Sequence, residues 1–133
     1  MKLFGVLALA LLVATGAYAS GKTKKTEAKA MTYSGFVVDQ MCGSGMAKKT
    51  DGMAKAAAHT KECALSSSCA ASGFGLFMKG KYYTFDSKGS DMAKSMLEKS
   101  TRSDHLYAEV TGSIKGTTMQ VSSIKEADAP ATK

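Results

Sequence analysis

The sequence of 133 residues lacks the motifs that identify the common enzyme and cofactor sites. It contains neither C-x-x-C nor C-x-x-C-H, so the spacing argues against a thioredoxin-like redox site and a c-type haem site. It also contains no nucleophile elbow, no H-E-x-x-H motif and no glycine-rich phosphate loop. We therefore expect a binding or accessory protein rather than an enzyme.

Only one long apolar run is present, and it lies at the start of the chain. Lys2, the apolar residues 3–14 and the small-x-small sequence A-Y-A at residues 17–19 are together typical of an export signal. The run is too short to span a bilayer comfortably, and no second apolar segment follows it. We therefore predict a signal peptide over residues 1–19 and a soluble exported protein, periplasmic or secreted, with no stable membrane anchor.

The chain also lacks an excess of acidic residues, since its formal net charge at pH 7 is +7. Four of the lysines lie in residues 20–31, a segment without apolar periodicity that is typical of a flexible basic linker. The remaining lysines are scattered along the chain, which favours a solvated surface over a surface that binds nucleic acid. Nucleic acid is therefore an unlikely partner.

Residues 32–125 contain short strand patterns and two helix patterns, followed by a disordered tail at residues 126–133. Strands are expected at residues 32–38, 74–78, 81–85, 106–114 and 117–124, and helices at residues 53–65 and 91–99. A cysteine-bearing helical insert thus separates strands one and two, and a helix separates strands three and four. This order predicts a mainly β domain with two helices, an OB-like five-stranded Greek-key barrel. A mostly antiparallel sheet with two helices on one face is the alternative.

All three cysteines and one of the two histidines belong to this insert and its edges. His59 and Cys63 are four residues apart on a predicted helix, so their side chains project from the same side. Cys42 follows the first strand, and Cys69 lies just beyond the helix. Three sulfur atoms and one imidazole would then converge, and three cysteines with one histidine form a known tetrahedral zinc site.

Other residues of the insert add to this metal hypothesis. Met41 and Met46 lie near Cys42 and could replace one of the ligands, and soft thioethers beside thiolates suit copper(I) at least as well as zinc. Asp39 could orient a ligand histidine or accept hydrogen bonds from the glycine-rich turn that follows it, and we favour the turn role. The possible cofactors are therefore zinc and copper.

An odd number of cysteines leaves other interpretations open. Cys42 could form a structural disulfide with Cys63 or with Cys69, which would leave one thiol unpaired. The unpaired thiol could be buried, could be redox-active or could join two chains, although we expect a monomer. The disulfide, the metal site and the thiol-redox site are alternatives at this point.

The predicted barrel suggests a further binding function. The second and third strands form the face that such barrels use for ligands, and Phe74, Phe77, Lys81, Tyr82 and Tyr83 lie on or beside it. Aromatic side chains next to lysines would suit single-stranded nucleic acid or a glycan. Barrel core is the simpler explanation for the phenylalanines.

The chain also resembles a family of small exported bacterial proteins of unknown function. The likeness is carried by G-F-V-V-D-Q-M-C-G at residues 35–43, the histidine- and cysteine-bearing residues 59–69, V-T-G-S-I-K-G at residues 110–116 and V-S-S-I at residues 121–124. The resemblance implies an OB-like barrel with a cysteine-containing helical insert. It supports the importance of the cysteines and implies no reaction.

Overall fold

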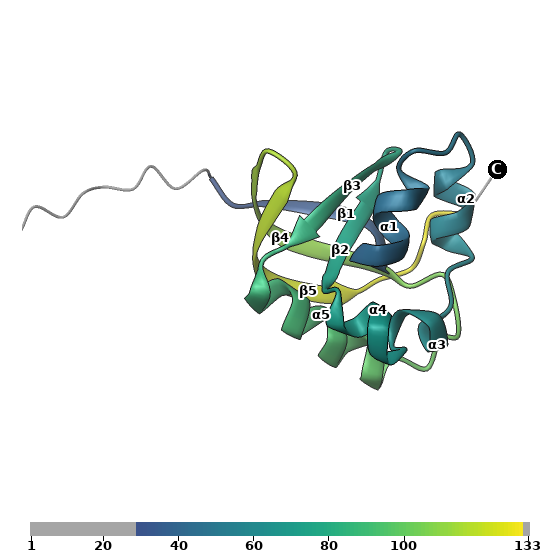
Figure 1. The fold of residues 1–133 in the computed structure, drawn as a ribbon. Coiled ribbons are helices and arrows are strands. Elements are labelled where there is room, and N and C mark those ends of the chain that lie inside the picture. Colours follow the sequence, from purple (N-terminus) through teal and green to yellow (C-terminus); the bar gives the residue numbers. More distant parts are fainter. Residues whose placement is uncertain (1–28, 132–133) are drawn as a thin grey trace, which may run out of the picture.

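The computed structural model describes residues 29–131 and contains a five-stranded mixed sheet (Figure 1). Its strands are β1 (Met31–Asp39), β2 (Phe74–Met78), β3 (Lys81–Phe85), β4 (Tyr107–Lys115) and β5 (Thr118–Glu126). A ring of hydrogen bonds closes the sheet in the order β1-β2-β3-β5-β4, with β3 and β5 parallel and the other pairs antiparallel. The predicted signal peptide and linker residues 20–28 lie outside the described residues.

Five helices accompany this sheet within the described residues, so the prediction of two helices is wrong. They are α1 (Gln40–Met46), α2 (Gly52–Ala57), α3 (Lys61–Ala64), α4 (Ser67–Ala71) and α5 (Ser87–Lys99). The first four lie between β1 and β2, and Figure 1 shows them grouped at one side of the barrel, while α5 runs along β5. In the part of the chain that is described, no helix combines the length and apolar character required to cross a membrane.

The helix predicted over residues 53–65 is broken in the structure, because α2 ends at Ala57 and α3 begins at Lys61. A continuous helix would need a hydrogen bond from the Lys61 N–H to the Ala57 carbonyl. Instead, Ala57 O accepts from His105 N at 2.9 Å, and Lys61 N donates to Ser103 O at 2.7 Å. The segment before β4 therefore takes over the bond that local helix propensity would have made.

The helix α1 replaces the glycine-rich turn that was expected after Asp39. Asp39 caps this helix, since its Oδ1 accepts a hydrogen bond from Cys42 N at 2.9 Å. Gly43 lies against the ring of Tyr82, where a side chain has no room. The glycine lowers helix propensity but allows α1 to approach β3 closely.

The hairpin between β2 and β3 turns at Lys79 and Gly80, the two residues between the strands expected at residues 74–78 and 81–85. Both turn residues have positive φ, 49° and 75°, as a tight two-residue hairpin turn requires.

The first and last strands are longer than the sequence predicted, because β1 starts at Met31 and β5 ends at Glu126. The predicted disordered tail is also ordered at its start, where Ala127 N donates to Tyr107 O at 3.0 Å.

Two hydrophobic clusters stabilise the fold. The larger one fills the barrel and packs against α5; its buried residues are Val37, Ala64, Phe74, Leu76, Phe85, Ala93, Leu97, Leu106, Ala108, Val110, Met119 and Val121. The smaller one lies under α1 and α2 and consists of Phe36, Val38, Ala56 and Phe77. Alternate residues of β1 enter the two clusters, so this strand is buried on both faces where it leads into the cysteine insert.

Candidate metal centre

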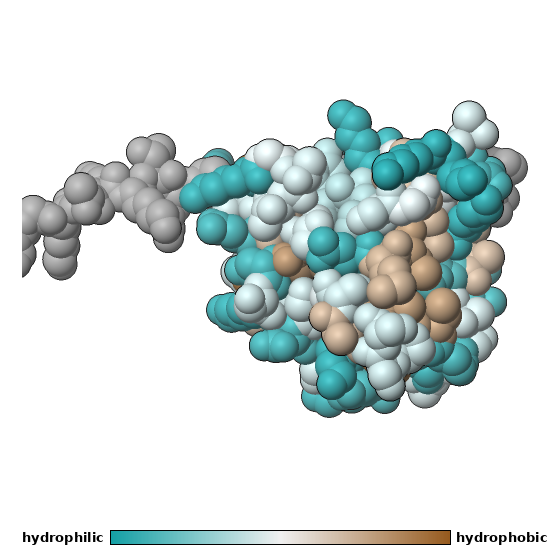
Figure 2. Space-filling model, in the orientation of Figure 1, coloured by the Kyte–Doolittle hydropathy of each residue, from teal (hydrophilic) through white to brown (hydrophobic). Residues whose placement is uncertain are grey.

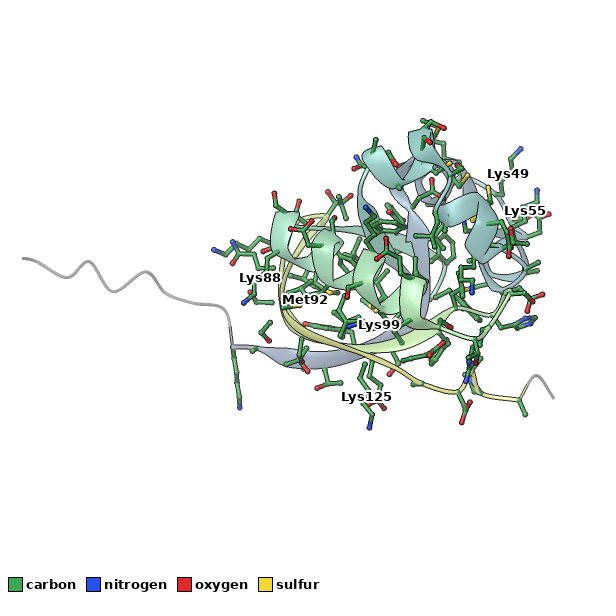
Figure 3. All side chains as sticks on the ribbon, turned by 90° about the horizontal axis from the view of Figure 1, so that it is seen from below. Lys49, Lys55, Lys88, Met92, Lys99 and Lys125 are labelled. Atoms are coloured by element: carbon green, nitrogen blue, oxygen red, sulfur yellow. The ribbon has the colours of Figure 1, made fainter. Side chains whose placement is uncertain are left out.

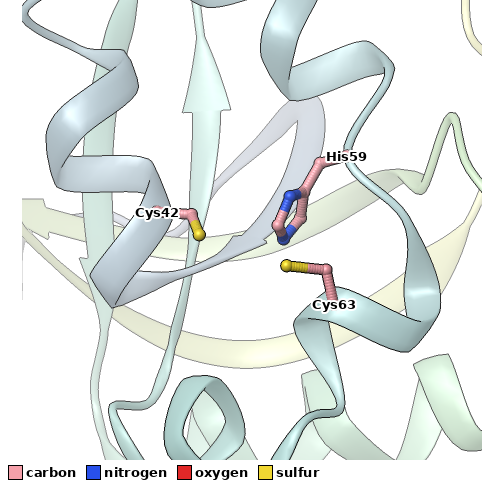
Figure 4. Close-up of side chains that lie close together, drawn as sticks. All are labelled: Cys42, His59 and Cys63. Carbon is pink, nitrogen blue, oxygen red and sulfur yellow. The ribbon is translucent and has the colours of Figure 1, made fainter.

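Separate elements bring the four predicted ligands to one side of the barrel. Cys42 lies on α1, His59 between α2 and α3, Cys63 on α3 and Cys69 on α4. The potential ligand atoms of Cys42, His59 and Cys63 all lie within 4.8 Å of one another, and Figure 4 shows their side chains directed toward a common point. Those of Cys42, Cys69 and Asp39 also lie within 4.8 Å of one another. Cys42 therefore connects the two groups.

Asp39 contacts two members of this cluster, one with each of its carboxylate oxygens. Its side chain is completely buried. Oδ1 accepts from Cys42 N at 2.9 Å, and Oδ2 lies 2.8 Å from Nε2 of His59, which is itself buried. Asp39 thus has both roles considered from the sequence, as a cap for α1 and as a partner for the histidine.

The sequence contains a signal for the first of these roles. Asp39 directly follows a strand and stands three residues before Cys42, which is the spacing between a capping residue and the N–H that it binds. Its contact with His59 has no comparable local signal, because the two residues are separated by 20 positions. For this reason the sequence favours the turn role for Asp39, and only the structure shows its contact with His59.

The Asp39–His59 pair has the form that supports metal-binding histidines. A carboxylate only accepts hydrogen bonds, so Nε2 of His59 carries a proton in this contact and Nδ1 of a neutral ring keeps a free lone pair. Histidines that bind metals usually donate from their second ring nitrogen to a carboxylate or carbonyl. The pair therefore fixes the orientation of the imidazole ring beside the thiols.

The three cysteines differ in exposure and are all free thiols. Cys69 is buried, Cys42 is half-buried and Cys63 is exposed. In the same region, the space-filling view shows hydrophobic side chains gathered over the surface where Figure 1 places α1 and α4 (Figure 2). Since Cys63 is the exposed cysteine, the cluster opens to solvent on the side of Cys63.

The surroundings keep the thiols of Cys42 and Cys63 protonated at neutral pH. Burial raises the pKa of Cys42 to about 12, and the negative charge of Asp39 adds to the effect. Burial also raises the pKa of Cys63, with a contribution from the neighbouring Cys69. A catalytic cysteine needs a lowered pKa, whereas a metal ion displaces the protons when it binds. The electrostatics therefore favour a ligand role over a nucleophilic one.

Without metal, stability and thiol reactivity are expected to change at alkaline pH. A Cys42 thiol has an ordinary pKa of 9.0, and the folded state raises it to about 12. Below pH 9 both states keep the proton; above it the unfolded chain ionises first, so stability falls as the pH rises toward 12. Mass-detected alkylation of the reduced protein should show a Cys42 rate that still increases above pH 9. A plateau below that pH would contradict the raised pKa.

The two methionines considered as substitute ligands have different surroundings. Met46 packs against the smaller hydrophobic cluster and therefore contributes to the core. Met41 is 58% exposed on α1, immediately before Cys42. Of the two thioethers, only that of Met41 is free of core packing.

The aromatic face predicted on β2 and β3 is largely covered. Phe74 and Phe77 are buried, and the hydroxyl of Tyr82 donates to the carbonyl of Val38 at 3.1 Å beneath α1. Tyr82 and Tyr83, both half-buried, line a hollow of about 330 Å³, together with Lys81, Ala47, Gly80, Gly116 and Thr117.

Comparisons with known proteins do not identify a function for this chain. No family model, curated protein or solved structure matches this chain. The resemblance to exported bacterial proteins stays a prediction, and the donor atoms themselves must indicate the ligand.

Proposed function

We propose that this protein is an exported accessory protein that binds zinc(II) or copper(I) through Cys42, His59, Cys63 and Cys69. The observation that carries the proposal is the meeting of the Cys42, His59 and Cys63 ligand atoms within 4.8 Å of one another. The sulfur of Cys69 lies within 4.8 Å of that of Cys42 and would complete a donor set of three sulfurs and one nitrogen. Such a set suits tetrahedral zinc, and sulfur-rich sites also suit copper(I).

The short helices of the insert give the metal a structural role as well. α2, α3 and α4 contain six, four and five residues, and helices of this length are not stable by themselves. A metal bound by Cys42, His59, Cys63 and Cys69 would connect α3, α4 and the turn before them to α1. Metal binding should therefore stabilise the folded insert.

Disulfide formation is the main competing use of the same residues. The sulfur of Cys42 lies within 4.8 Å of that of Cys63 and, in the second group, within 4.8 Å of that of Cys69. Cys42 is thus close enough to both cysteines for either of the disulfides considered from the sequence. A thiol-redox function would use the same proximity, with the exposed Cys63 as the accessible partner. The experiment below separates these alternatives from metal binding.

We also propose that the closed sheet is an OB-like barrel. The strand order β1-β2-β3-β5-β4 and the position of α5 between β3 and β4 support this assignment. Figure 3 shows Lys49 and Lys55 in the insert, Lys88 and Lys99 on α5, and Lys125 on β5. These positive charges point outward from separate elements, so the charge distribution favours the metal proposal over an oligonucleotide-binding face.

Intact mass measurement tests the proposed function. The reduced protein, incubated with one metal at a time, should take up one zinc or copper ion in the native spectrum and lose it on denaturation, with three free thiols remaining. Cys63→Ser should weaken the affinity by more than about 100-fold, which is the upper end of the effect of losing a supporting residue. Ser67→Ala, an exposed change on the adjacent α4, is the matched control and should leave the affinity unchanged.

Two results would contradict metal binding. One is a reduced protein that takes up neither metal. The other is a Cys63→Ser variant that binds metal as tightly as the wild type. A mass lighter by two hydrogens in the protein purified without reductant, with no metal adduct, would instead indicate a disulfide and one free thiol.

A further inference from the structure

We infer that the three sulfurs of Cys42, Cys63 and Cys69 form a site for a trivalent metalloid oxyacid of the arsenite class. The inference rests on the proposed function in so far as it uses the same thiol cluster. It differs in its ligand set, because trivalent arsenic is held by three thiolates in a pyramid and needs no nitrogen ligand. It therefore names a class of ligand that would compete with a metal ion for the cluster.

Electric charge favours the metalloid. Three thiolates around zinc(II) carry a net charge of −1, and around copper(I) a net charge of −2, and the buried carboxylate of Asp39 adds another negative charge. Among the described residues, no lysine or arginine side chain forms a hydrogen bond or ion pair with Asp39 or with the cysteines. Three thiolates on arsenic(III) form a neutral unit. Asp39 has His59 as its hydrogen-bond partner at 2.8 Å, and a neutral product adds no further charge beside this buried pair, where an unpaired charge would be costly.

Cys42 brings the other two sulfurs within reach of one small ligand. It is the common member of the two groups in which ligand atoms lie within 4.8 Å of one another, so its sulfur lies within 4.8 Å of that of Cys63 and within 4.8 Å of that of Cys69. Cys69 lies at the buried end, whereas Cys63 is exposed and gives a small uncharged oxyacid a way in. The Asp39–His59 hydrogen bond of 2.8 Å can stay intact, since arsenic does not require the imidazole.

The binding step is balanced without any redox partner. Arsenous acid, As(OH)₃, reacts with three thiols: three S–H bonds and three As–O bonds break, and three As–S bonds and three O–H bonds form. Each thiol proton leaves with a hydroxide as water, so three water molecules depart. Arsenic remains in the trivalent state and no electron is transferred.

The test uses the reduced full chain with sodium arsenite as the probe. Native mass spectrometry should show one arsenic per chain, with a mass gain of one arsenic less three hydrogens, and a thiol assay should find no free thiol. Cys63→Ser should lose this adduct, and thermal unfolding shows whether the variant is folded. Ser67→Ala is again the matched control and should bind as the wild type does.

His59→Gln separates the two proposals, because zinc would use the imidazole and arsenic would not. The variant should weaken zinc binding and leave arsenite binding unchanged. No arsenic adduct in a wild type that takes up zinc would overturn the inference and leave the proposed function standing. Loss of arsenite binding in a folded His59→Gln variant, or an unchanged adduct in Cys63→Ser, would also overturn it. If the wild type binds neither probe, both proposals fail.

Discussion

Replacing Asp39 with alanine is expected to lower the free energy of unfolding by about 2 to 4 kcal/mol, the combined cost of a lost helix cap and of a buried histidine left without its hydrogen-bond partner. The carboxylate is completely buried and lies 2.8 Å from Nε2 of His59. Its removal leaves the histidine buried without its partner. It also leaves the Cys42 N–H at the start of α1 without its acceptor.

Each of these losses has a known scale. An N-cap contributes about 1 kcal/mol, and a buried polar group that loses its partner costs about 1 to 3 kcal/mol. A small domain is stable by only about 5 to 15 kcal/mol in total, so the change removes a large share of that stability. Urea denaturation of the reduced protein without metal measures the effect directly.

Asp39→Asn distinguishes the cap from the contact with His59. Asparagine caps helices as well as aspartate does, so α1 should keep most of its stability, while the histidine loses its carboxylate. We expect zinc affinity to fall by about 10- to 100-fold, as is typical when the partner of a ligand histidine is changed. Competition with a chelating dye measures this affinity.

Asp51→Ala is the control for both variants. Asp51 is exposed, makes no side-chain capping bond and pairs with Lys55 at 3.1 Å on the surface. Its replacement should change stability by no more than about 0.5 kcal/mol and leave zinc affinity unchanged. Equal effects of Asp39→Ala and Asp51→Ala would mean that the carboxylate of Asp39 does not organise the cluster.

The second large effect is expected at Gly43, where a methyl group has no room. A Cβ atom at this position would lie 2.3 Å from the Tyr82 ring, which is held beneath α1 by its hydrogen bond to Val38. Gly43→Ala should therefore push α1 away from β3 and destabilise the protein by about 1 to 3 kcal/mol. Because Cys42 is the preceding residue, metal affinity should fall as well.

Gly45→Ala provides a matched comparison on the same helix. No atom lies within 4 Å of the Cβ that this change would add. Alanine favours helix over glycine by about 0.5 to 1 kcal/mol, so this variant should be more stable than the wild type. Thermal unfolding of the two variants should give shifts of opposite sign. Shifts of the same sign would show that the contact with Tyr82 does not limit the position of α1.

Local signals were sufficient for much of the barrel. The β2 and β3 bounds agree with the strands expected at residues 74–78 and 81–85, because their apolar and aromatic residues flank a two-residue turn. The helix expected at residues 91–99 is present but begins at Ser87 with Asp86 as its cap. The side chain of Asp86 accepts a hydrogen bond from Gly89 N. The spacing of these two residues is compatible with a helix cap, but the sequence alone does not show that the bond forms.

The insert behaves differently, since long-range contacts decide its shape. The alanine-rich residues 53–65 favour one helix, yet the backbone groups of Ala57 and Lys61 bind to the segment before β4. Two short helices result, and His59 lies in the turn between them. The expected closeness of His59 and Cys63 is confirmed, but it arises from this turn and from Asp39 rather than from a continuous helix.

By itself, the sequence determined the chemical inventory: three thiols, an imidazole and thioethers in one insert, and strands with the right alternation for a closed sheet. These features depend on residue types and short spacings, so local sequence patterns are sufficient to predict them. Only the tertiary structure decided that the buried carboxylate of Asp39 stands between Cys42 and His59. The reason is that a contact across 20 residues depends on how β1, α1 and the turn after α2 pack, and no local pattern encodes that packing.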